Sequence, residues 1–444
     1  MEKLLNNQRK YHIVTYGCQM NIHESEKLAG IMQDLGYTET FSENNADVII
    51  FNTCCIRENA EDRAEGNIGA LKKLKKSNKN LIIAVGGCMT QQPEKAESLK
   101  KKFPFIDIIF GTHNLENFKE LLEKKLARKK GVIEILEKEE KVKEGTPKFR
   151  TSFPNAWINI MYGCNNFCTY CIVPYVRGRE RSRKKEDIIA EVKSVLESGY
   201  KEITLLGQNV NSYGKDLENV DFADLLEEIA LLDGKFRLRF MTNHPKDLSE
   251  KLIKVIAKYD KICKHIHLPI QSGSTNILKL MNRRYTRENY LEKVSLIRKY
   301  IPDIAITSDV MVGFPQETEQ DFLDTFNLMK EVEFSGAFTF IYSKRSGTPA
   351  AKMDGQVEES VSKERIQKLI NLQNDINRKQ SKEYEGKETE ILCEGFDEKK
   401  NKYFGRDQYN RMAYFDSEND IIGQFVKVKI ENCGGISLMG KLIK

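Results

Sequence analysis

Short apolar runs alternate with helix-like segments along the first part of the chain. Within the longer segments, apolar residues recur every three or four positions, which is the period of an amphipathic helix. Strands that alternate with helices form a parallel sheet covered on both faces, so the pattern predicts an α/β domain over residues 1–128. The predicted strands are residues 11–18, 46–54, 80–88 and 106–114, and the predicted helices are 25–37, 58–76, a segment from about Pro93 and 115–130.

The same alternation returns over residues 150–380, after a charge-rich segment at residues 129–149. That segment is interpreted as a strand or as a loose linker between domains. Six βα units predict a (βα)6 partial barrel, whose active site lies in the loops after the strands. The strands are expected at 156–164, 202–209, 237–245, 264–272, 305–315 and 336–343, with helices such as 185–200 and 319–334 between them.

The pattern changes again over residues 381–444, where short strands are punctuated by glycine. Strands at 388–396, 401–407, 411–415, 423–433 and 436–443 predict a small β-barrel of a kind that often binds nucleic acid. The charge of this region is nearly balanced, so electrostatics alone give little support for RNA binding. Its aromatic residues could stack on RNA, although a role in the barrel core is the favoured interpretation; they are Tyr403, Phe404, Tyr409 and Tyr414.

Composition narrows the class of protein. The chain has 444 residues, a net charge of +6, 40% apolar and 31% charged residues, which is typical of a globular protein with several domains. No run of ~18 apolar residues is present, so no membrane association is expected. The polar N-terminus lacks a signal peptide, which predicts a cytoplasmic protein. In a reducing compartment, clustered cysteines are metal ligands or catalytic groups more often than disulfides.

The strongest chemical signal is a Cys-x3-Cys-x2-Cys loop formed by Cys164, Cys168 and Cys171. Three thiolates on a tight loop can hold three irons of a cubane iron–sulfur cluster. The missing fourth cysteine leaves one iron open, and an open metal position can bind a substrate or cofactor. The alternative is a three-cysteine zinc site completed by a distant histidine, which the spacing disfavours because zinc sites prefer paired cysteines.

Three further cysteines end the first three predicted strands. Cys18, Cys54 and Cys88 lie 36 and 34 residues apart, one βα unit each. Right-handed crossovers place all three at the carboxyl-terminal edge of the sheet, where open α/β sheets bind ligands. A second trithiolate site is therefore predicted, against the alternative of three small buried residues. Cys55 adjoins Cys54, and adjacent strand residues point to opposite sides, so both cannot readily serve one site.

Other candidates carry weaker signals. The basic run at residues 175–185 is the best candidate for RNA phosphate contacts, although such a run is often only a solvated face. Its arginines are Arg177, Arg179, Arg181 and Arg183. His265 and His267 are interpreted as satisfied core residues, and the isolated cysteines as structural; these are Cys263, Cys393 and Cys433.

Several motifs together resemble the radical S-adenosylmethionine (SAM) methylthiotransferase family over nearly the whole chain. The N-terminal motifs are "YGCQMN", "NTCCIREN" and "GGCMTQ", and the central ones include "MYGCNNFCTYC", "LLGQNVNSYG", "HLPIQSGS" and "SDVMVGFPQET". The C-terminal region resembles the family's TRAM domain in position and size. The residues of these motifs are most similar to those of the branch of the family that acts on N6-isopentenyladenosine in tRNA.

This resemblance implies two [4Fe-4S] clusters and two molecules of SAM. One cluster, on Cys164, Cys168 and Cys171, would bind SAM at its open iron and yield a radical. The other, on Cys18, Cys54 and Cys88, would serve as sulfur donor or carrier, with Arg57 near it and Cys55 at a variable position. Candidates for SAM contacts are Tyr170 inside the cysteine loop, the strand-end residues Gln208, Asn209, Gln271, Ser272 and Asp309, and the pair Arg283 and Arg284. The alternative for the strand-end residues is a polar cap on a loop, and for the two arginines a solvated helix end.

The implied reaction adds a methylthio group to carbon 2 of N6-isopentenyladenosine beside the tRNA anticodon. The expected partners are the tRNA anticodon stem-loop, an electron donor such as flavodoxin or ferredoxin, and a sulfur or cluster-repair source, with the enzyme itself a monomer. Sister families perform the same chemistry on threonylcarbamoyl-adenosine in tRNA or on an aspartate of a ribosomal protein. A hypothesis from another class is a non-catalytic RNA-binding protein that contains structural zinc.

Overall fold

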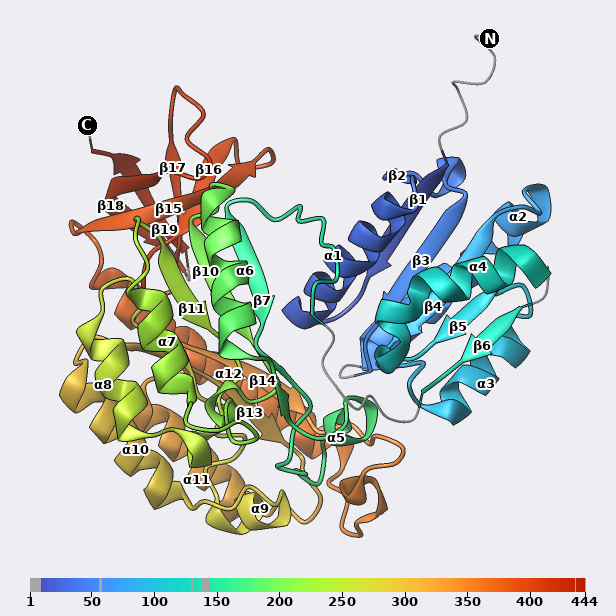
Figure 1. Ribbon diagram of the computed structural model, residues 1–444. Coiled ribbons are helices and arrows are strands. Elements are labelled where there is room, and N and C mark those ends of the chain that lie inside the picture. The colour runs from blue at the N-terminus through green and yellow to red at the C-terminus, as the bar shows by residue number, and fades with distance from the viewer. Residues whose placement is uncertain (1–8, 56–57, 129–130, 137–143, 436, 444) are drawn as a thin grey trace. The chain divides into compact units, whose positions relative to one another are not determined.

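The computed structural model describes residues 9–55, 58–128, 131–136, 144–435 and 437–443 (Figure 1). The chain divides into two compact units. The first comprises Met1–Thr151, Tyr162–Asn165 and Ile172–Arg181, and the second comprises Ser152–Met161, Asn166–Cys171 and Ser182–Lys444. Within the described ranges, none of the helices combines the length and apolar character needed to cross a membrane.

The first unit is built on a six-stranded sheet in the order β2-β1-β3-β4-β5-β6, and every neighbouring pair is parallel. Its strands are β1 (Lys10–Thr15), β2 (Thr38–Glu39), β3 (Val48–Thr53), β4 (Ile82–Gly87), β5 (Ile108–Phe110) and β6 (Val132–Glu134). Its helices are α1 (Gln19–Asp34), α2 (Glu58–Ser77), α3 (Pro93–Lys102), α4 (Phe118–Arg128) and the single turn α5 (Val173–Val176).

Helices cover both faces of this sheet, as the alternating pattern predicted (Figure 1). Helices α1 and α4 pack on one face, around Leu28 and Phe118, and helices α2 and α3 pack on the other, around Ile68 and Leu99. Strands β3 and β4 are buried along their whole length, which explains why they read as continuous apolar runs. Strand β6 lies within the segment predicted as strand or linker, and it pairs with β5 at the edge of the sheet.

The second unit begins with the partial barrel, and the predicted six strands are confirmed. The strands lie in two parallel sheets, β11-β10-β7 and β12-β13-β14, and an isolated bridge pairs Leu238 of β11 with Ile262, three residues before β12. They are β7 (Asn155–Asn159), β10 (Glu202–Leu206), β11 (Arg237–Phe240), β12 (His265–His267), β13 (Ala305–Val312) and β14 (Gly336–Ile341). Two short strands, β8 (Met161–Tyr162) and β9 (Arg181–Ser182), pair with each other.

The helices of the second unit begin at local sequence signals. Asp221, Thr286 and Thr318 each form a capping box, in which the side chain accepts from the backbone N–H three residues on and is bonded reciprocally. The helices are α6 (Lys185–Glu197), α7 (Phe222–Ala230), α8 (Glu250–Lys258), α9 (Thr275–Leu280), α10 (Arg287–Tyr300), α11 (Glu319–Val332) and α12 (Glu359–Lys382).

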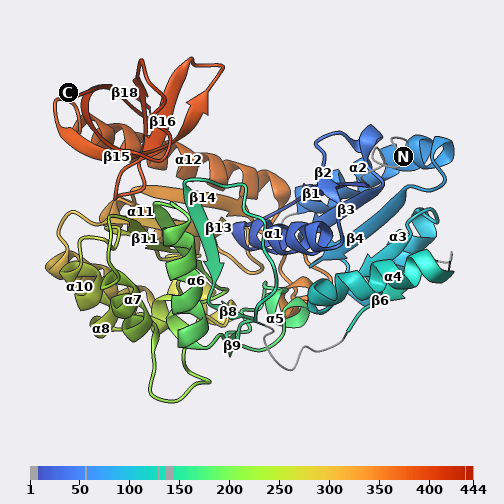
Figure 2. The ribbon, with the colours of Figure 1, turned by 45° about the horizontal axis from the view of Figure 1, so that its top comes forward.

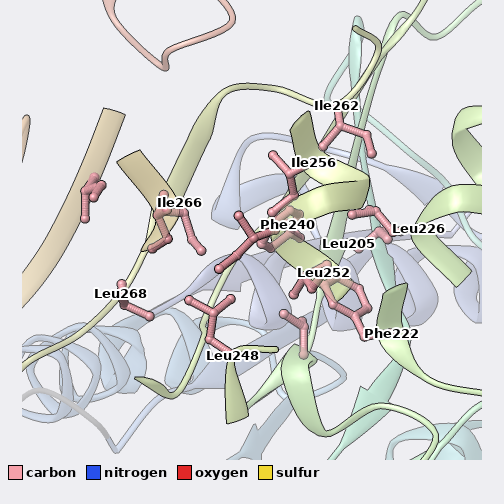
Figure 3. Close-up of a cluster of buried hydrophobic side chains, with 14 of the residues drawn as sticks. Leu205, Phe222, Leu226, Phe240, Leu248, Leu252, Ile256, Ile262, Ile266 and Leu268 are labelled. Atoms are coloured by element: carbon pink, nitrogen blue, oxygen red, sulfur yellow. The ribbon is translucent and has the colours of Figure 1, made fainter. Parts of the chain in front are cut away.

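Apolar side chains from these helices and strands form one continuous core. Leu205 and Phe240 project from β10 and β11 toward Phe222 and Leu226 of α7 and Leu252 of α8 (Figure 3). Phe222 and Phe240 meet edge to face, with ring centroids 5.2 Å apart. This packing fixes the strand ends on which the active-site loops are carried.

The C-terminal strands close into a barrel in the order β15-β16-β17-β19-β18, which confirms the predicted small β-domain. Helix α12 leads from the core to this barrel (Figure 2). The strands are β15 (Glu388–Asp397), β16 (Lys402–Arg406), β17 (Met412–Asp416), β18 (Phe425–Gly434) and β19 (Ser437–Leu442). Residues such as Ile391, Phe415 and Val428 fill the interior.

Candidate functional site

The N-terminal cysteines lie at the carboxyl ends of three neighbouring strands. Cys54 and Cys88 directly follow β3 and β4, and Cys18 follows β1 as the N-cap of helix α1. Because α1 and α2 leave β1 and β3 toward opposite faces, the strand order reverses between these two strands. Ligands of open α/β sheets bind at such a switch point, beyond the carboxyl ends of the strands. The sheet therefore brings the three cysteine-bearing segments to a place built for a ligand.

Two glycines allow these segments to approach closely. Gly17 has a φ of +110°, and a Cβ there would lie 2.5 Å from the Cβ and 2.7 Å from the Sγ of Cys54. Gly87 has a φ of +106°, and a Cβ there would collide with the carbonyl oxygen of Thr53. The glycines before Cys18 and Cys88 thus keep free the space that the facing strand ends occupy.

The thiols at this edge are buried and differ in their partners. Cys55 donates a hydrogen bond to Cys88, whereas Cys54 lies against Gly17. The pKa of Cys88 is lowered to about 7, mainly by this hydrogen bond, and the charge of Arg177 helps to overcome the opposing effect of burial. Burial raises the pKa of Cys18, partly offset by Arg177. Within the described residues, no three His, Cys, Asp or Glu side chains stand in a metal-binding arrangement.

Arg177 is a component of this edge, which corrects its expected role as an RNA contact. Its guanidinium is only 5% exposed and forms a two-pronged ion pair with Glu24, at 2.5 and 3.0 Å. Its Nη2 also donates to the Oδ1 of Asn21, at 3.1 Å. The segment that follows the Cys-x3-Cys-x2-Cys loop therefore returns to the N-terminal domain and places a cation beside its cysteines.

The second set of cysteines is carried by the loop that precedes α5. The N–H of Cys171 donates to the carbonyl of Cys168 at 2.9 Å, which makes a tight turn, and Phe167 has a φ of +48°. The N–H of Cys164 donates to the carbonyl of Gly178 at 3.2 Å. The hydroxyl of Thr169 is bonded to the carbonyl of Leu280, which anchors the middle of the loop to the end of α9.

Arg283 lies against this loop with its charge buried. Its Nη1 is 3.5 Å from the Sγ of Cys168 and 3.4 Å from the hydroxyl of Tyr170, and its Nη2 donates to the carbonyl of Pro269 at 2.8 Å. Its Nε donates to the hydroxyl of Tyr285 at 2.9 Å. Burial raises the pKa of Tyr170 well above its usual value, so the phenol remains protonated. The site thus combines thiols with a fixed positive charge.

The remaining candidates for SAM contacts fall into two groups. Ser272 is fully buried and bonded to Thr325, and Asn209 is buried with its amide bonded to Ser212, Asp247 and the N–H of His244. These internal bonds occupy both side chains, which argues against a role of either in SAM binding.

Three further candidates stay predictions. Gln271 has a φ of +69° and exchanges backbone hydrogen bonds with β13, so its strained position is held by the sheet. Asp309 is partly exposed and its carboxylate is 3.5 Å from His267. Gln208 is half-buried at the end of β10.

The basic run also divides by burial. Arg183 is buried, donates to the carbonyl of Asn159 and pairs with Glu191 at 2.8 Å. Its burial argues against the predicted contact with RNA. Arg179 is exposed and Arg181 is half-buried, so both stay predictions. In the barrel, Phe404 and Tyr414 are half-buried, with ring centroids 6.2 Å apart. His265 and His267 are both buried and share the hydroxyl of Thr307, as expected of satisfied core residues.

Comparisons with known proteins find family matches in three regions of the chain. The Radical SAM superfamily matches residues 158–329, Uncharacterized protein family UPF0004 matches 10–111, and the TRAM domain matches 382–443. The radical SAM methyltransferase TsrM from Kitasatospora setae shares the fold over 77% of this chain and 75% of its own, with a TM-score of 0.56 and 15% identity. Fold, three-cysteine loop and superfamily match define a radical SAM enzyme, a class that binds a [4Fe-4S] cluster and SAM.

Curated relatives narrow the class further. A tRNA-2-methylthio-N(6)-dimethylallyladenosine synthase from Clostridium botulinum (strain Langeland) is 55% identical over 99% of this chain and 98% of its own length. One of the same name from Thermoanaerobacter pseudethanolicus is 53% identical over 98% of this chain and 93% of its own. The chain belongs to this family of tRNA methylthiotransferases.

The residues present fit the groups that the family implies. Thiolates are the ligands of iron–sulfur clusters, and a buried guanidinium beside each set complements the negative charge that such a cluster carries. Asn21 and Glu24 were not predicted. Asn21 and Glu24 lie three residues apart on helix α1, so their side chains are neighbours on its surface, but nothing in the local sequence links them to Arg177.

Proposed function

We propose that this protein adds a methylthio group to carbon 2 of N6-dimethylallyladenosine, also called N6-isopentenyladenosine, beside the tRNA anticodon. The observation that carries the proposal is 55% identity to a synthase of this reaction over 99% of the chain, with both sets of three cysteines in place. Membership of the radical SAM superfamily argues against the alternative of a non-catalytic zinc protein.

Each set of residues has a separate role in this proposal. Cys164, Cys168 and Cys171 hold the cluster that binds SAM, and Cys18, Cys54 and Cys88 hold a second [4Fe-4S] cluster for the sulfur. Bound at the first set, cluster and SAM supply the radical chemistry that the inert C–H bond of adenine carbon 2 requires. Arg283 holds a positive charge beside Cys168, and Tyr170 is a protonated donor beside it.

The substrate is a base of the anticodon stem-loop, which must be splayed out of its stack to reach a protein pocket. Arg179 and Arg181 are the remaining candidates in the basic run for phosphate contacts. We further propose a cytoplasmic monomer that takes electrons from a flavodoxin or ferredoxin and renews its sulfur from a separate cluster-repair source.

Mass spectrometry of tRNA nucleosides tests the reaction. A bacterial strain that lacks its own enzyme should accumulate isopentenyladenosine, and expression of this chain should convert it to the methylthio form. The Cys164→Ala variant serves as the control and should leave the unmodified nucleoside. Methylthiolation of threonylcarbamoyl-adenosine instead would move the protein to the sister branch. Anaerobically reconstituted protein should contain about eight irons per chain, four for each cluster.

A further inference from the structure

Two of the three cysteine-bearing segments of the N-terminal domain are bonded directly to one buried side chain, that of Asn21, and the third is bonded to one of the same backbone carbonyls. Its Nδ2 donates to the carbonyls of Tyr16 at 2.7 Å and Thr53 at 3.0 Å, the second of which immediately precedes Cys54. The same carbonyl of Thr53 accepts the N–H of Cys88 at 3.0 Å. The Oδ1 of Asn21 faces the Sγ of Cys18 at 3.8 Å. Asn21 therefore ties the ends of β1 and β3 together directly, and β4 joins them through the shared carbonyl of Thr53.

Arg177 joins this arrangement from outside the sheet. It donates to the Oδ1 of Asn21, and its positive charge lies close enough to Cys88 to lower the pKa of that thiol. Glu24 holds the guanidinium from the other side, on the face of α1 that carries Asn21. Arg177 and Glu24 are each only 5% exposed and Asn21 is fully buried, so their charges and dipoles act in a medium of low dielectric.

We infer that Arg177, Glu24 and Asn21 position the cluster proposed on Cys18, Cys54 and Cys88, and that the opposed charges of Arg177 and Glu24 set its reduction potential. This inference rests on the proposed function, because it requires the second cluster. The three residues are positioning residues, since they act on the cluster through its ligands and not on the substrate. Outer-shell partners of this kind commonly tune the affinity and potential of a metal site.

The sign of each effect follows from electrostatics. Reduction adds one negative charge to a cluster, and a buried cation nearby stabilises that charge. Loss of the Arg177 cation leaves the Glu24 carboxylate uncompensated, which disfavours reduction and lowers the potential. Loss of the Glu24 charge leaves the cation uncompensated, which favours reduction and raises the potential. Removal of both charges restores a neutral pair and returns the potential toward that of the parent protein.

The experiment uses the full chain with Cys164, Cys168 and Cys171 replaced by alanine, so that only the N-terminal cluster can form. After anaerobic reconstitution, iron is counted and the potential is measured by a redox titration followed by electron paramagnetic resonance. We expect Arg177→Gln to lower the potential and Glu24→Gln to raise it, each by at least tenfold in the reduction equilibrium, which is about 59 mV for a one-electron couple. The double variant should lie between them.

Two further variants separate positioning from folding. Asn21→Ala removes the shared contact, so we expect it to lose most of the four irons while the protein without iron keeps its helical circular dichroism. Lys75→Gln removes a charge from another ion pair of this domain, with Asp107 at 2.7 Å, near the start of β5 at the opposite edge of the sheet. This control should leave iron content and potential unchanged.

The outcomes are distinct. If the parent with the three alanines binds no four-iron cluster, the second cluster of the proposed function is refuted and the inference falls with it. If that parent binds the cluster, but Arg177→Gln and Glu24→Gln shift the potential in the same direction or not at all, the inference alone is overturned. If Arg177→Gln fails to hold a cluster, the reduction potential is measured in Glu24→Gln and in Arg177→Lys instead. A potential of Glu24→Gln that does not rise would then overturn the inference.

Discussion

The two sets of cysteines each lie beside a buried arginine, and the two arginines differ in what balances their charge. Arg177, beside Cys18 and Cys88, is held by the carboxylate of Glu24. Arg283, beside Cys168, has only neutral partners among the described residues apart from that thiol, namely two tyrosine hydroxyls and a backbone carbonyl. One site thus contains a neutral pair and the other an uncompensated cation.

This difference shows how one chain can prepare two similar ligand sets for different work. An uncompensated buried cation is costly unless an anion fills the site, so Arg283 favours a bound group of negative charge. The pair of Arg177 and Glu24 carries little net charge and instead fixes geometry through Asn21. The uncompensated charge of Arg283 thus favours reduction of a group bound beside Cys168. At the N-terminal cysteines, the balance of Arg177 against Glu24 would hold the proposed second cluster in place and set its potential.

The largest effects are expected from variants that test whether the two sets of cysteines form separate sites. The triple change of Cys18, Cys54 and Cys88 to alanine should abolish methylthiolation but retain cleavage of SAM, because the other cluster is intact. The triple change of Cys164, Cys168 and Cys171 should abolish both. Chromatographic assay of 5′-deoxyadenosine and of the modified nucleoside checks both variants. Loss of SAM cleavage in the first variant would contradict the separation of the sites.

Substitution of the adjacent residues Cys54 and Cys55 tests which of them is a ligand at the N-terminal site. Cys54→Ser should lose the N-terminal cluster and fall from about eight to about four irons per chain, whereas Cys55→Ser should keep about eight. The structure makes this test informative, because the thiol of Cys55 also lies beside that of Cys88. Iron and sulfide analysis of the reconstituted variants measures the result, and the reverse pattern would assign Cys55 as the ligand.

Substitution of Arg283 tests whether its uncompensated positive charge contributes to the site at Cys168. Arg283→Gln should lower SAM cleavage by roughly 10- to 100-fold, as is common for changes around metal ligands. Arg283→Lys keeps the charge but cannot reproduce the bonds to Tyr285, Tyr170 and Pro269 together, so we expect an intermediate rate. Single-turnover cleavage with a chemical reductant gives the rates. Equal rates of SAM cleavage in the parent and in Arg283→Gln would show that the site does not need the charge of Arg283.

The smallest effect is expected from an exposed arginine of the same basic run. Arg179→Ala should weaken tRNA binding modestly and reduce the slope of log affinity against log salt by about 1, while both clusters persist. Filter binding over a range of salt concentrations measures this slope. An unchanged slope would remove Arg179 from the set of phosphate contacts, and loss of iron would place it with Arg177 instead.

The fold was predictable from the sequence because its strands and helices differ in period. The buried strands β3 and β4 read as continuous apolar runs, and the five strands of the barrel are separated by glycine and polar turns. The strand β6 was ambiguous, since three residues at a sheet edge in a charged segment carry little periodic signal. Arg57 lies outside the described residues, so its expected place near the N-terminal cysteines stays a prediction.

The site was only partly predictable, because charge in a sequence does not reveal burial. The three strand-end cysteines followed from their regular spacing and the handedness of βα units. The basic run looked uniform, yet Arg177 and Arg183 are buried in ion pairs while Arg179 is exposed. The partner of Arg177 lies 153 residues away at Glu24, a separation that no local pattern can indicate.

The closed C-terminal barrel restricts how this protein can hold a partner. Each of its strands is paired on both sides, so the described residues of the barrel offer no free edge to which a strand from another molecule could add. The domain is therefore protected from edge-to-edge aggregation, and recognition by β-strand addition is closed to it. Whatever binds there must be gripped by loops and by side chains that project from the barrel wall.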